Sequence, residues 1–162
     1  MIGRLLKNKY SIIGLILIIG MVAFIYSNAH EKSVPDVDIS TINEAVAPTC
    51  NYSAASPSEN RMIKRYYGFN PNDYGEMYYY APTDTMDATE LLIVKLNNES
   101  DAATIEEAIK DRLEMQKKAF DGYGTNQTEQ LNASRLIVKG RYILFVVDDN
   151  ATKAADAFEK CF

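Results

Sequence analysis

The chain has 162 residues, with 17 Lys and Arg against 22 Asp and Glu and a formal net charge of −5. This acidic balance argues against a nucleic-acid partner, because binding to phosphates needs a basic surface. The single His and the two Cys lie far apart in the sequence, so we expect no zinc site, no other metal and no cofactor. The length is enough for one domain beyond a leader segment.

The N-terminal segment separates basic residues from a long uncharged run. Three cations precede residues 10–26, and these seventeen residues carry no charge. As a helix they are about 26 Å long, slightly shorter than the ~30 Å hydrocarbon core of a bilayer, and flanking lysines can cover the difference. We expect residues 1–29 to be an uncleaved signal-anchor that crosses the membrane through residues 10–26. The alternative is a secretory signal peptide that is cleaved after Ala29.

The position of the basic residues also predicts the orientation of the chain. Because the cations precede the apolar run, the N-terminus is expected in the cytoplasm and the remainder outside it. We expect residues 30–38 to be a linker and residues 39–162 to be a single extracytoplasmic domain. Outside the cytoplasm a disulfide between Cys50 and Cys161 is permitted. Two unpaired thiols are the alternative, since sequence spacing alone does not decide between them.

Within the domain, apolar periodicity and turn residues predict four helices and four strands. Asp38 is expected to cap the first helix. Ser56-Pro57-Ser58-Glu59 resembles a capping box that opens a second helix, which Gly68 ends. We expect residues 122–131 to form a loop. The predicted helices are 39–46, 56–67, 101–121 and 152–160, and the predicted strands are 75–81, 89–96, 134–139 and 142–147.

The order of these elements predicts the fold class. Two hairpins alternate with helices, which is typical of an α+β domain. We expect one antiparallel sheet of about four strands, built on a ββαββα core. Since an antiparallel sheet can leave one face in water, the helices are expected on one face of the sheet.

Polar residues interrupt the apolar stripe of the long helix. Arg112 and Gln116 lie four residues apart on the face expected to meet the sheet, and Glu90 lies on the matching face of the preceding strand. An unpaired buried charge is costly, and Arg–carboxylate pairing offsets that cost. We therefore predict that Glu90 and Arg112 meet under the sheet, with Gln116 beside them, as a polar clamp. The alternative is that the same group lines a pocket.

Tyrosine is abundant, with eleven Tyr and no Trp. Tyr78, Tyr79 and Tyr80 are consecutive in a predicted strand, so their rings alternate between the two faces. Exposed Tyr rings suit sugar or peptide ligands. These three residues and Tyr123 are the predicted binding residues, and an aromatic edge strand without a ligand is the alternative.

No catalytic residue is predicted. Asp84, Asp87 and Glu90 form one acidic cluster and Asp148-Asp149 another, and each is a candidate for a metal site or a glycosidase pair. Both clusters fall where turns and caps use acidic residues. The chain has no Gly-x-Ser-x-Gly, P-loop or Cys–His pair. We expect a non-enzymatic binding or interaction module with a protein or cell-wall partner, and the alternative is a carboxylate-dependent hydrolase of envelope polymers.

Three short motifs resemble those of a known family. They are Ala88-Thr89-Glu90-Leu91, the series Arg112, Gln116, Phe120 and Tyr123, and Gly140-Arg141-Tyr142. The pattern is similar to that of anchored extracytoplasmic proteins of Gram-positive bacteria catalogued as a domain of unknown function. Gly124-Thr125 replaces the proline that usually follows Tyr123, and no lipobox is present. The resemblance covers residues 36–158 and implies an envelope location and a shared fold, without implying a chemical activity.

Overall fold

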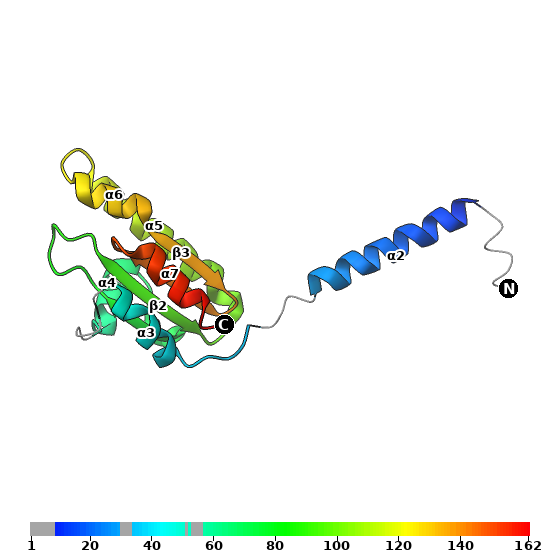
Figure 1. Ribbon diagram of the computed structural model, residues 1–162, viewed down its shortest axis with the longest axis horizontal. Coiled ribbons are helices and arrows are strands. Elements are labelled where there is room, and N and C mark those ends of the chain that lie inside the picture. The colour runs from blue at the N-terminus through cyan, green and yellow to red at the C-terminus, as the bar shows by residue number, and fades with distance from the viewer. Residues whose placement is uncertain (1–8, 30–33, 51, 53–56) are drawn as a thin grey trace. The chain divides into compact units, whose positions relative to one another are not determined.

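The computed structural model describes residues 9–29, 34–50, 52 and 57–162 (Figure 1). The chain divides into two compact units, Met1–Ser33 and Val34–Phe162. In the first unit the apolar run belongs to helix α2 (Lys9–Ala29). Among the described residues, no helix is both long and apolar enough to span a bilayer. The predicted transmembrane helix is therefore not confirmed.

The second unit is built on a four-stranded antiparallel sheet with the order β1-β2-β4-β3. The two central strands have the sequences ELLIVKL and YILFVV, and nearly every residue in them is buried. Side chains alternate between the faces of a strand, so such continuous apolar runs need cover on both faces. The strands are β1 (Gly75–Tyr80), β2 (Glu90–Leu96), β3 (Arg135–Lys139) and β4 (Tyr142–Val147).

Helices cover both faces of this sheet (Figure 1). On one face α3 and α7 pack on a cluster that includes Leu91, Ile93 and Leu144. On the other face α4, α5 and α6 pack on a cluster that includes Leu92 and Phe145. The α+β class and the four-stranded antiparallel sheet are confirmed, but the prediction of helices on one face is wrong. The helices are α3 (Ile39–Val46), α4 (Asn60–Tyr67), α5 (Ala102–Phe120), α6 (Thr125–Ala133) and α7 (Ala151–Glu159), with 3-10 turns at Ala47–Cys50, Pro71–Asp73 and Glu99–Asp101.

Two local predictions need correction. The segment 122–131, expected to be a loop, contains most of α6. Helix α4 begins at Asn60 rather than within the predicted capping box, of which Ser56 lies outside the described residues. Ser58 instead pairs with β1, since its N–H donates to Tyr79 O (2.6 Å) and its Oγ accepts from Ala81 N–H (3.1 Å). The Ser58 hydroxyl, which the sequence pattern assigned to a helix cap, thus accepts a hydrogen bond from the residue that follows β1.

Residues 34–38, here called the strap, attach the start of the domain to one end of the sheet. Asp36 accepts hydrogen bonds from Lys95 Nζ (2.8 Å), from Arg141 and from the Tyr142 hydroxyl (2.9 Å). Val37 N–H donates to the same hydroxyl (2.8 Å). The hydrogen bond from Lys95, followed by those from Arg141 and Tyr142, holds the pKa of Asp36 well below its usual range. The second half of the predicted linker therefore lies against the sheet.

We expect Asp36→Ala to loosen the strap. A carboxyl whose pKa is lowered in the folded state stabilises that state above its ordinary pKa of 3.8, and the effect is lost as pH falls through the lower folded value. At pH 7 the amide of Val37 should exchange with solvent faster in the variant than in the wild type. Asp156→Ala, an exposed change on α7, is the control. Equal Val37 exchange rates in the wild type and Asp36→Ala would contradict the role given to Asp36.

Candidate functional site

A carboxylate is buried at the start of β2. Glu90 is 0% exposed, and its Oε1 accepts hydrogen bonds from the hydroxyls of Tyr67 and Tyr79, each at 2.6 Å. Tyr67 is the last residue of α4, and Tyr79 lies in β1, the strand next to β2. Two elements therefore reach the same oxygen of one side chain.

The second oxygen of Glu90 binds a third element. Arg112 of α5 places Nε and Nη2 each 3.3 Å from Oε2. The guanidinium of Arg112 also stacks on the ring of Tyr66, with Cζ 4.3 Å from the ring centroid. We call Glu90, Tyr66, Tyr67, Tyr79 and Arg112 the Glu90 cluster. It connects β2 to β1, α4 and α5.

The two tyrosines act as hydrogen-bond donors in this cluster. Burial raises the pKa of Tyr67 and of Tyr79 well above the usual value of 10, and the neighbouring Glu90 carboxylate raises both further. Both hydroxyls are thus protonated at neutral pH. Burying a carboxylate without partners is costly, and two hydroxyl donors and a guanidinium offset that cost.

The structure places the three predicted clamp residues as follows. Glu90 and Arg112 form the contact described above. Gln116 is buried, at 4% exposure, and its Oε1 has no hydrogen-bond partner among the described residues. Tyr66 and Tyr67 were not predicted from the sequence. Their position at the end of an amphipathic helix that faces the same sheet could have indicated that they lie near Glu90.

The predicted tyrosine surface is mostly internal. Tyr79 and Tyr80 are 1% and 4% exposed, so the prediction that these rings present a binding surface is wrong for both. The ring of Tyr79 faces the α5 side of the sheet and that of Tyr80 faces the α3 side, where its hydroxyl donates to Asn43 Oδ1 (3.1 Å). Tyr78 is half-buried, whereas Tyr123 is 64% exposed in the turn between α5 and α6. Helices on both faces of the sheet therefore bury the rings of this edge strand, which solvent would otherwise reach.

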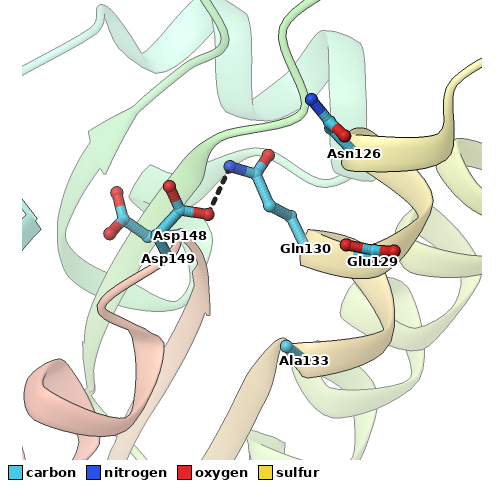
Figure 2. Close-up of a pocket in the computed structure, with 6 residues that line it drawn as sticks. All are labelled: Asn126, Glu129, Gln130, Ala133, Asp148 and Asp149. Carbon is cyan, nitrogen blue, oxygen red and sulfur yellow. Dashed lines mark hydrogen bonds between the residues drawn. The ribbon is translucent and has the colours of Figure 1, made fainter.

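Two adjoining hollows lie at the end of the sheet where β2 begins and β4 ends. The first, of about 380 Å³, lies between α6 and the turn after β4 (Figure 2). The second, of about 360 Å³, lies between α6 and the β1–β2 loop. Both are lined by Asn126 and Gln130, so we treat them as one polar groove. Its other lining residues are Asp84, Met86, Asp87, Ala88, Thr89, Gln127, Glu129, Ala133, Asp148 and Asp149.

Amide side chains of α6 hold the walls of this groove. Gln130 Nε2 donates to Asp149 Oδ1 (2.8 Å), as Figure 2 shows, and Gln127 Nε2 donates to the carbonyl of Met86 (2.9 Å). Sequence reasoning missed both residues because it expected a loop here. The available signal was a stretch without Gly or Pro between Gly124 and Ser134.

Two of the groove acids organise the β1–β2 loop. Asp87 accepts hydrogen bonds from the N–H and hydroxyl groups of both Thr83 and Thr89, at 2.6–2.9 Å. Asp84 accepts from Met86 N–H (2.7 Å). Asp84 and Asp87 therefore stabilise the turn, which is the structural role that the sequence suggests as an alternative to a metal site or a glycosidase pair. Among the described residues, no three His, Cys, Asp or Glu side chains are grouped to hold a metal ion.

Asp148 differs from the other groove acids in its burial. It is 8% exposed, and its Oδ1 accepts from Asn150 N–H (2.7 Å) in the turn that leads to α7. Burial raises its pKa above the ordinary 3.8, and the nearby carboxylates of Asp149 and Asp87 raise it further. One wall of the groove thus holds a carboxyl that takes up a proton more readily than a solvated one.

A third hollow, of about 410 Å³, lies between α4 and α5. Its lining includes Tyr66 and Tyr67 of the Glu90 cluster together with Arg65, Asp111 and Met115. It carries charges of both signs, so its chemistry favours no single class of ligand.

Both cysteines are free thiols. Cys50 is buried and Cys161 is half-buried, and both pack against the cluster on the α3 side of the sheet. Of the two alternatives from the sequence, the structure has the unpaired one. Burial raises the pKa of Cys50 to about 11, so the thiol is not a nucleophile at neutral pH.

We expect Arg112→Ala to lower the free energy of unfolding by about 3–5 kcal/mol, because it leaves the Glu90 carboxylate buried without a cation. Tyr79→Phe should cost about 1–3 kcal/mol through loss of one hydrogen bond to a charged group. Chemical denaturation measures both. Arg61→Ala, which removes an arginine whose side chain is 78% exposed, is the matched control and should change stability by less than about 0.5 kcal/mol. A cost for Arg112→Ala as small as that of the control would refute the clamp.

Asp148→Asn should raise the melting temperature at pH 7. A carboxyl whose pKa is raised by burial destabilises the folded state once pH exceeds that raised value, and has no effect below its ordinary pKa of 3.8, where both states are protonated. Asparagine keeps the acceptor for Asn150 N–H and removes the charge. The gain should therefore vanish near about pH 3, whereas the exposed control Asp121→Asn should show no such trend. A gain that does not depend on pH would contradict this assignment.

Comparison with known proteins identifies a family over most of this architecture. The domain of unknown function DUF4358 matches residues 49–148, which include all of the Glu90 cluster and every residue that lines the polar groove except Asp149. No curated protein and no solved structure gives a significant match. Because the match spans more than half of the chain, the protein belongs to the DUF4358 family.

Proposed function

We propose that this protein is a non-enzymatic binding module and that the polar groove is its ligand site. The observation that carries the proposal is the position of the groove relative to the strap. The strap is held at the end of the sheet that contains Lys95 and Arg141, whereas the groove lies at the end that contains Glu90 and Asp148 (Figure 1). The polar groove therefore lies at the end of the sheet away from the point where the chain enters the domain.

The chemistry of the groove favours a polar ligand that donates hydrogen bonds. Its walls combine the amides of Asn126 and Gln130 with the carboxylates of Glu129 and Asp149. Carboxylates accept from N–H and O–H groups and attract amines. A protein segment or a cell-wall component with amide and amino groups has the required donors.

We place this activity outside the cytoplasm. The support comes from the sequence, in which three cations precede the seventeen uncharged residues 10–26. The leader then acts either as a membrane anchor or as a signal peptide that is cleaved after Ala29. In both cases the domain that begins after the leader meets envelope components.

One observation favours a second candidate, a carboxylate-dependent hydrolase of envelope polymers. Asp148 has a raised pKa and lines the same hollow as Glu129, which lies on the facing helix (Figure 2). A buried acid with a raised pKa opposite a second carboxylate is the arrangement that general acid–base hydrolysis uses. Under this candidate, Asp148→Asn abolishes turnover of purified envelope polymer. A binding module shows no turnover in either form.

The binding proposal is tested by crosslinking in the native cell. A photoreactive amino acid at Gln130, in the groove, should give a discrete adduct. The same amino acid at Glu76, an exposed residue of β1 near the strap end, should not. Adding Asn126→Ala should weaken the adduct at Gln130, because it removes a groove amide without touching the crosslinker. Equal adducts at Gln130 and Glu76 would contradict the assignment of the groove.

A further inference from the structure

The strand β3 lies at the edge of the sheet, and its hydrogen-bonding pattern shows which groups are open. Leu96 N–H donates to Arg141 O (2.8 Å), so residue 141 and every second residue after it bond toward β2. The alternate residues of β4, including Tyr142 and Leu144, therefore bond toward β3, where they pair with Lys139 and Ile137. The backbone groups of the intervening residues, Leu136 and Val138, point away from the sheet.

These outward groups have no partner in the described part of the chain. No hydrogen bond joins the N–H or C=O of Leu136 or Val138 to any described residue. The opposite edge of the sheet differs, because Ser58 bonds to Tyr79 O and Ala81 N–H beside β1. A strand with an open edge is a template for pairing with another extended chain.

The side chains of β3 define what such a chain must carry. Arg135 and Lys139 lie on the α7 face, where they contact Thr152 (3.3 Å) and Glu159 (2.7 Å). Leu136 and Val138 lie on the other face, where Val138 is 39% exposed. The edge is therefore apolar in the middle and basic at both ends.

We propose that β3 accepts an extended segment of a partner protein as a fifth, antiparallel strand, and that this segment has an apolar centre with an acidic residue at each end. Cross-strand pairing would set the two acids opposite Arg135 and Lys139 and the apolar residues opposite Leu136, Ile137 and Val138. A second copy of this chain fits less well. Antiparallel pairing centred on Ile137 would set Arg135 opposite Lys139 of the other copy, and like charges in that position repel. The β3 edge shares no lining residue with the polar groove.

The test uses the full chain and a fluorescent peptide, Ser-Glu-Val-Ile-Val-Glu-Ser, with a version that has Lys in place of each Glu. Fluorescence anisotropy should show saturable binding of the Glu peptide and binding of the Lys peptide at least about tenfold weaker. Hydrogen exchange should show that the Glu peptide protects the amides of Leu136 and Val138. Equal affinity for the two peptides, or unchanged exchange of both amides, would overturn the proposal.

Two variants separate strand pairing from simple contact. Val138→Pro removes an outward N–H that the sheet does not use, so the fold should persist while affinity for the Glu peptide falls about tenfold or more. Val138→Thr keeps the N–H and the β-branched shape and should change affinity less than about threefold. Circular dichroism checks folding, and if Val138→Pro unfolds, the exchange measurement on the wild type decides. Unchanged affinity in a folded Val138→Pro chain, or sedimentation showing dimers that Val138→Pro dissolves, would refute the proposed occupant.

Discussion

A carboxylate in an apolar interior needs hydrogen-bond donors on both of its oxygens. The donors to Glu90 position the elements on one face of the sheet. Its partners come from the end of α4, from β1 and from the middle of α5. Each donor must lie within hydrogen-bond distance of one fixed point on β2. Apolar packing alone tolerates small shifts of a helix on a sheet, whereas these short polar contacts do not. The Glu90 cluster therefore fixes the register of two helices on one face of the sheet.

The remaining architecture separates two ends of the sheet. At one end, Asp36 draws Lys95, Arg141 and Tyr142 together and holds the strap. At the other end, no comparable set of ion pairs closes the described surface, and α6 leaves a polar groove beside Asp148. The attachment of the strap and the proposed ligand site thus lie at opposite ends of the sheet, and loops at the free end can vary without disturbing the attachment. The edge strand β3 adds a third surface along the side.

The sequence predicted the elements with strong local signals. The four strands, the Asp38 cap and the Gly68 stop follow from periodicity and cap chemistry, and the structure confirms them. The presence of helices on both faces of the sheet was not predicted, because the order of hairpins and helices says little about which face a helix covers. The apolar runs in β2 and β4 did carry that information, since such strands are buried on both faces. Helix α6 was missed because its one buried residue, Leu131, gives almost no periodic signal. The groove depends on α6, so the prediction of a loop over residues 122–131 also prevented prediction of the groove.

The most direct test of the account is a double-mutant cycle on Glu90→Gln and Arg112→Met, followed by chemical denaturation. If the buried ion pair fixes α5 on the sheet, each single variant leaves an unmatched polar group and the double variant recovers part of the loss. The predicted coupling is about 2–3 kcal/mol, at the upper end of the range for residues in contact. Additive effects, with coupling below about 0.5 kcal/mol, would show that packing holds the helix and that the carboxylate has no organising role.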